Sequence, residues 1–142
     1  MEYRKFDQAY VVRLDRGDEV LECLSYLCRQ EAIELASVTG LGAVNEVLLG
    51  LFDTEQKRYY SKDYKGVYEI ASLVGNISRK DGEPYLHLHM VIGNVVTGEC
   101  SGGHLSRAVI SATGEIIVNV INGTVGRRMD EAVGLNLYQF GD

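Results

Sequence analysis

The 142-residue sequence contains no tryptophan and a single proline, Pro84. No low-complexity run marks a linker, so we expect one domain over residues 1–142. No stretch approaches the roughly 20 apolar residues of a transmembrane helix, and the charged first ten residues lack the apolar segment of a secretory signal. These absences predict no membrane contact and a cytoplasmic location.

Cysteine and positive charge are also scarce. Cys23, Cys28 and Cys100 follow no regular spacing, which predicts free thiols in a reducing compartment. Lysine and arginine number 14 against 20 aspartates and glutamates, and the net charge is −6. Because nucleic-acid binders gain much of their affinity by neutralising phosphates, this composition disfavours direct DNA binding by the chain alone.

One segment, residues 19–32, has the periodicity of a helix. Val20, Leu24 and Leu27 recur at helical spacing and leave charged residues on the opposite side. Asp18 precedes this segment and is expected to cap its free amides. We expect this to be the main helix.

The rest of the sequence is rich in apolar and β-branched residues, and its 16 glycines suit a turn-rich β protein. The Asp81-Gly82 pair predicts a hairpin because both residues tolerate a positive φ. The fold class is therefore α+β, a mostly antiparallel sheet packed with one main helix. The expected strands are 9–14, 34–38, 44–52, 57–60, 67–77, 85–92, 107–112, 115–121 and 135–140, with turns at 40–42 and 61–66 and one helical turn at 129–133.

The three histidines of the sequence form its main candidate site. His87 and His89 alternate in a strand, so they point to the same face with Cα atoms about 6.6 Å apart. Two imidazoles at that separation can bind one metal ion through bonds of about 2.0–2.1 Å. His104 follows Gly102-Gly103, and a strand–loop–strand path would bring it back beside the pair. We predict metal binding by His87, His89 and His104.

Two alternatives remain open at this point. The histidine pair would also serve as the polar face of a strand whose other face is apolar, with an unrelated loop histidine. If a metal is bound, Glu99 and Cys100 are candidates for a fourth ligand, and Glu99 or Tyr85 could act as an acid or base. No catalytic residue is assigned from the sequence.

Several segments occur in an order that resembles the PPC domain family (plants and prokaryotes conserved domain), in its stand-alone prokaryotic form. They are Gly40-Leu41-Gly42-Ala43, the strand 68–77, His87-Leu88-His89-Met90, Gly102-Gly103-His104-Leu105 and Thr113-Gly114-Glu115-Ile116. The resemblance implies an α+β fold assembled as a homotrimer. It also implies a metal ion, zinc above all, held by histidines that match His87, His89 and His104. The AT-hook of plant members, which enters the DNA minor groove, has no counterpart in this sequence.

Three functions are compatible with these observations. The first is a trimeric binding or interaction module with a three-histidine site for zinc or another divalent metal, in which the metal is either structural or senses a small-molecule ligand. The second is a small metal-dependent hydrolase or lyase that uses metal-bound water. The third is a DNA-associated or regulatory protein that acts through a partner or a surface formed in the trimer.

Overall fold

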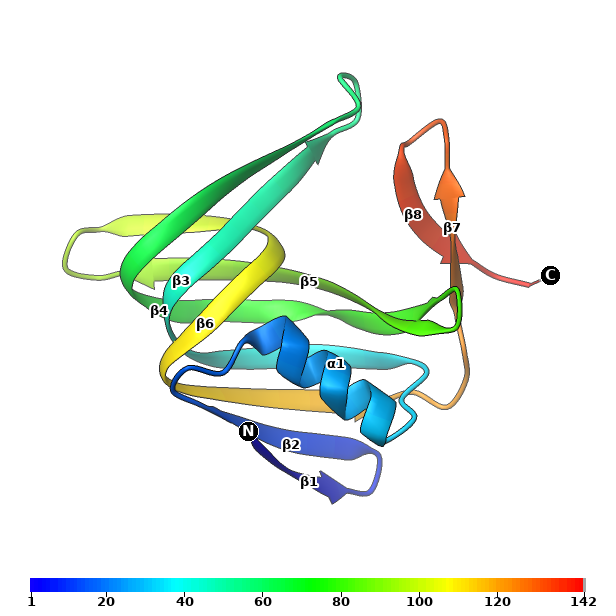
Figure 1. The fold of residues 1–142 in the computed structure, drawn as a ribbon, viewed down its shortest axis with the longest axis horizontal. Helices are drawn as coiled ribbons and strands as arrows, with labels where there is room; N and C mark the ends of the chain where they lie inside the picture. Colours follow the sequence, from blue (N-terminus) through cyan, green and yellow to red (C-terminus); the bar gives the residue numbers. More distant parts are fainter. Residues whose placement is uncertain (142) are drawn as a thin grey trace.

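The protein is described by a computed structural model that covers residues 1–141. It consists mostly of antiparallel β-strands with one helix, in agreement with the predicted arrangement (Figure 1). The elements are β1 (Glu2–Phe6), β2 (Ala9–Asp15), α1 (Val20–Gln30), β3 (Ala36–Asp53), β4 (Arg58–Lys80), β5 (Glu83–Asn94), β6 (Glu99–Val120), β7 (Gly126–Asp130) and β8 (Leu135–Gln139).

The main sheet has six strands in the order β1-β2-β6-β3-β4-β5, and β5 pairs with β6 as well. Strand β6 is long enough to serve both pairings. Its first residues, Glu99 to His104, pair with β5, whereas residues Thr113 to Asn119 pair with β2. The sheet therefore curls until β5 meets β6, and this closure determines where the histidines lie.

Helix α1 begins where predicted, although a different residue caps it. Glu19 has extended backbone angles (φ −97°, ψ 126°), and its carboxylate accepts a hydrogen bond from the Glu22 backbone N–H at 2.8 Å. Asp18, the expected cap, instead accepts from the Asp15 backbone N–H and binds the Met1 amino group at 2.8 Å. The prediction of Asp18 as the cap was wrong because this carboxylate holds the N-terminus in place.

Helix α1 lies across one face of the sheet (Figure 1). The hydrophobic core lies between this face and the helix. The helix contributes Val20, Leu24, Leu27 and Cys28, each fully buried. The other face of the sheet carries exposed apolar side chains. We call this surface the open face and define it by Val11, Leu41, Val74 and Val91.

The strands are longer than the sequence indicated. β3 runs through residues 40–42 and β4 runs through 61–66, so the turns expected there are absent. The glycines mark register shifts inside β3 rather than chain reversals. At Gly42 a Cβ atom would lie 2.3 Å from the Thr113 carbonyl oxygen, so only glycine lets β6 approach so closely. Segments 107–112 and 115–121 likewise belong to the single strand β6.

Three further local predictions can be compared with the structure. The hairpin at residues 81–82 is confirmed, with φ values of 52° at Asp81 and 82° at Gly82. The helical turn expected at 129–133 is confirmed in part: Met129 and Asp130 end β7, whereas residues 131–134 form a turn in which the Gly134 N–H donates to the Asp130 carbonyl at 2.6 Å. Strand β1 was not predicted. Its residues Glu2 to Phe6 are largely exposed and give little apolar signal. No helix within residues 1–141 is long and apolar enough to cross a membrane.

Candidate functional site

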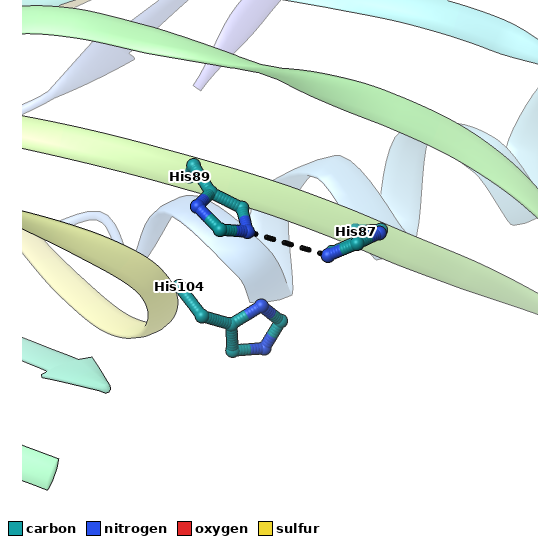
Figure 2. Close-up of side chains that lie close together, drawn as sticks. All are labelled: His87, His89 and His104. Carbon is teal, nitrogen blue, oxygen red and sulfur yellow. Dashed lines mark hydrogen bonds between the residues drawn. The ribbon is translucent and has the colours of Figure 1, made fainter. Parts of the chain in front are cut away.

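The closure of β5 onto β6 brings the three histidines together. His87 and His89 project from the same face of β5, as the alternation of strand side chains requires. His104 lies on β6 directly opposite His89 in the antiparallel register. Figure 2 shows the three rings gathered around a common region in front of the two strands.

The ring nitrogens fit the size of a metal ion. One ligating nitrogen from each ring can be chosen so that all three lie within 4.8 Å of one another. Nitrogens bound to the same tetrahedral ion at about 2.0–2.1 Å are about 3.4 Å apart. The Nε2 atoms of His87 and His89 are 3.3 Å apart (Figure 2). An imidazole–imidazole hydrogen bond has a similar length, so this one distance suits both a metal-bound and a metal-free pair.

Glycines on neighbouring strands allow the histidine-bearing backbones to pack closely. At Gly75 on β4, a Cβ atom would lie 2.1 Å from the His87 carbonyl oxygen and 2.8 Å from Leu88 Cα. At Gly103 on β6, a Cβ atom would lie 2.7 Å from the Gly50 carbonyl oxygen. Atoms cannot approach this closely, so both positions require glycine. The double glycine before His104 therefore serves close strand packing rather than a loop.

The rings of His87 and His104 are half-buried, whereas His89 is exposed. Burial is the main cause that lowers the pKa of the His87 ring, followed by the positive charge of Arg127 and then by the other two histidines. Burial, and then His89, lowers the pKa of His104. Both shifts favour the neutral ring, which is the form that binds a metal.

The histidines line a cavity of about 870 Å³ between the sheet and the β7–β8 hairpin. This volume lies in the range of small-molecule sites, about 300–1,000 Å³. Within residues 1–141, no aspartate or glutamate lines the cavity. Its remaining lining residues are Gly50, Leu51, Phe52, Tyr59, Asn76, Tyr85, Gly103, Arg127, Leu135, Asn136, Leu137 and Tyr138.

Arg127 on β7 was not identified from the sequence. Its guanidinium donates to Ser78 Oγ at 2.7 Å, Asn76 Oδ1 at 2.8 Å and the Asn136 carbonyl at 2.9 Å. The rings of Tyr85 and Tyr138 lie 4.6 Å and 4.3 Å from the guanidinium carbon. Since Asn76 pairs with His87 across β4 and β5, these contacts place the arginine beside the histidines.

The other residues proposed from the sequence fall into two groups. Tyr85 lines the histidine cavity. Glu99 and Cys100 are not part of the histidine cluster within the described residues. They precede His104 on β6 by five and four residues, which corresponds to about 17 and 13 Å along a strand. Glu99 accepts a hydrogen bond from the Tyr68 hydroxyl at 2.9 Å instead. Within one chain, therefore, neither residue lies close enough to complete the metal site.

Solved structures with the same fold include several from bacteria and archaea. A protein from Bacteroides thetaiotaomicron, provisionally described as DNA-binding, has a TM-score of 0.94 and 32% identity over 98% of this chain and 96% of its own. A metal-containing protein from Archaeoglobus fulgidus has a TM-score of 0.86 and 32% identity over the same shares, 98% and 96%. A plant- and prokaryote-conserved (PPC) protein from Pyrococcus horikoshii has a TM-score of 0.84 and 31% identity over 99% and 95%.

A comparison with curated proteins finds no match. The sequence model of the Plants and Prokaryotes Conserved domain, abbreviated PCC or PPC, matches residues 1–122. The β7–β8 hairpin follows this matched region. Because the match spans most of the chain and relatives of the same fold exceed 30% identity, the chain belongs to the Plants and Prokaryotes Conserved domain family.

Proposed function

We propose that this protein is a ligand-binding module that holds a divalent metal ion through His87, His89 and His104. The observation that carries the proposal is the convergence of three ring nitrogens within 4.8 Å of one another. All three residues stand on paired strands, which position side chains more rigidly than loops do. The likeness to the archaeal metal-containing protein supports metal binding by this fold.

Zinc is the metal that we propose for this site, since neutral imidazoles suit it and three histidines are a known zinc ligand set. Three histidines would leave the fourth coordination position of a tetrahedral zinc ion for water or for an atom of a bound small molecule. A zinc ion bound there supplies positive charge that attracts an electron-rich group. The three histidines would hold the ion in place, and the adjoining cavity of about 870 Å³ would hold the body of the ligand.

The first experiment is elemental mass spectrometry of the purified protein together with its mass in solution. About one zinc per chain, as a single three-histidine site would hold, supports the proposal. Protein that stays metal-free after exposure to stoichiometric zinc, nickel and copper in turn would contradict the proposed metal site. In that case the histidines would form only a polar surface linked by imidazole hydrogen bonds.

We also propose that the module assembles as a homotrimer through its apolar surfaces. Leu41 is 56% exposed and Val74 48% exposed on the open face, and exposed apolar patches mark protein–protein interfaces. Light scattering after size exclusion would measure the mass. A trimer that Leu41→Lys weakens supports an interface on the open face, whereas a monomer at micromolar concentration contradicts the proposal.

A metal-dependent hydrolase or lyase is the second candidate, favoured by the size of the cavity beside the histidines. Tyr85 is the lining residue that this function would use as an acid. The lack of a carboxylate in the cavity lining, as far as residues 1–141 extend, removes the usual general base. Screening zinc-loaded protein against ester and phosphoester substrates tests it, and turnover that His89→Ala abolishes would favour the enzyme.

A DNA-associated role is the third candidate, suggested by the descriptions of the Bacteroides protein and of a similar one from Ralstonia eutropha. The net charge of −6 provides little driving force for binding by one chain. Titration of a duplex at two salt concentrations tests this role. Affinity that falls steeply with salt would support it, and no binding at low salt would exclude it.

A further inference from the structure

We propose that Arg127 forms an anion subsite that binds the carboxylate of a small, otherwise apolar ligand in the histidine cavity. The subsite is built by the β7–β8 hairpin, which follows the region matched by the family. It would fix one end of the ligand while the histidine site faces the other. Only this second contact rests on the proposed function, because the arginine requires no metal to bind an anion.

The hydrogen bonds of Arg127 leave part of its donor capacity unused. A guanidinium carries five N–H groups, one on Nε and two on each terminal nitrogen. Nε donates to Ser78, Nη2 to Asn76 and Nη1 to the Asn136 carbonyl. One N–H therefore remains on each terminal nitrogen. We infer that these two N–H groups face the cavity side by side, where they match the two oxygens of a carboxylate in the bidentate arrangement that arginine favours.

The positive charge of Arg127 has no counter-ion within residues 1–141. All three hydrogen-bond acceptors are neutral oxygens, and none of the ion pairs in the described part of the chain involves this arginine. The side chain is also half-buried, and Tyr85 and Tyr138 cover it. A buried charge is stabilised by an opposite charge, so the site favours an anion.

The rest of the cavity indicates what kind of anion fits. Arg127 is its only lysine or arginine among the described residues, which suits a single negative charge better than a phosphate. Leu51, Phe52 and Leu135 line the same space and provide apolar contact for a carbon skeleton. The ligand class is therefore a monocarboxylate with an apolar or aromatic body.

Benzoate and its neutral isostere benzamide are suitable probes because they differ mainly in charge. Binding of each is measured by calorimetry or NMR titration on the full chain, both zinc-loaded and after removal of metal by a chelator. We expect benzoate to bind about tenfold or more tightly than benzamide, since a charge-assisted bidentate pair replaces a neutral contact. The preference should persist without metal. Equal affinity for the two probes would overturn the proposal.

Three variants separate the arginine from its surroundings. Arg127→Met keeps an apolar stem and should remove the preference for benzoate, whereas Arg128→Met, on the neighbouring exposed residue of β7, should keep it. Asn76→Asp is a second test whose result does not depend on whether Arg127→Met folds. It keeps a hydrogen-bond acceptor where Asn76 Oδ1 lies, 2.8 Å from the guanidinium, adds an internal carboxylate, and should also lose the preference.

The outcomes are distinguishable from those of the metal proposal. If benzoate binds only to metal-loaded protein and Arg127→Met leaves its affinity unchanged, the carboxylate binds the metal and the arginine subsite is refuted. If inorganic phosphate displaces benzoate at a lower concentration than benzoate itself requires, the assignment to carboxylates is wrong. Metal content, measured separately, tests the histidine site whatever the probes show.

Discussion

His89 and His104 occupy directly opposed positions on β5 and β6, with ring centroids 5.6 Å apart. Their backbones belong to one antiparallel ladder, so the two side chains are held by hydrogen bonds along the strands rather than by a mobile loop. His87 completes the group two residues earlier on β5. Local strand geometry therefore fixes two of the three rings, and the non-local pairing of β5 with β6 adds the third.

Loss of His89 tests the metal site most directly. His89→Ala removes one of three ligands from the most exposed position, and two histidines bind a divalent metal weakly. We expect zinc content after dialysis to fall from about one per chain to near zero. Val91→Ala is a matched control because this exposed residue lies on the same face of β5. Zinc that remains stoichiometric in His89→Ala contradicts the assignment.

Gly75 tests whether close strand packing positions His87. In Gly75→Ala the added Cβ would lie 2.1 Å from the His87 carbonyl oxygen, so β4 and β5 must separate locally. We expect a loss of about 1–3 kcal/mol in the free energy of unfolding, as for overpacked sites, together with weaker zinc binding.

Gly93→Ala is the control for this prediction. A Cβ atom there would meet only the Glu99 carbonyl oxygen, at 3.9 Å, which is an ordinary contact. Denaturant unfolding and zinc titration of both variants provide the comparison. If Gly75→Ala and Gly93→Ala behave alike, the close approach of β4 to His87 has no role in the site.

The parts of the fold that follow from local sequence were predicted well. The α1 periodicity, the Asp81-Gly82 turn and the shared face of His87 and His89 depend on residues a few positions apart. The lengths of β3, β4 and β6 were underestimated because glycine signals a turn in a short window. At Gly42, however, the glycine permits contact with β6, whose residues lie about 70 positions later in the sequence.

The candidate site was predicted in part for the same reason. His104 was recognised because histidine is rare in this sequence and a family resemblance supported it. Arg127 could not be recognised, since its role depends on Asn76, Ser78 and Tyr85, which lie on strands 42–51 positions earlier. No periodicity or spacing signals such a contact. Glu99 was proposed from its closeness in sequence, but an extended strand carries it away from His104.

Glu19 links the start of α1 to the sheet. One carboxylate oxygen accepts from the Glu22 backbone N–H, and the other accepts from the backbone N–H of buried Ala108 on β6, each at 2.8 Å. Glu19→Ala removes both acceptors and should lower the free energy of unfolding by about 1–3 kcal/mol. Glu22→Ala, exposed in the same helical turn, should cost under about 1 kcal/mol. Equal losses in denaturant unfolding would contradict this role.

Tyr10 should make stability depend on pH in the alkaline range. Burial, followed by the hydrogen bond that its hydroxyl donates to Glu31 at 2.7 Å, raises the pKa of Tyr10 to about 12. An unfolded tyrosine ionises near 10, so the folded state retains its proton over a window in which the unfolded state loses it. The stabilising contribution is therefore complete below pH 10 and decreases as the pH rises toward about 12. Urea unfolding at pH 9 and pH 11 should show this decrease in the wild type and a smaller one in Tyr10→Phe. An identical decrease in the two proteins would show that Tyr10 is not the titrating group.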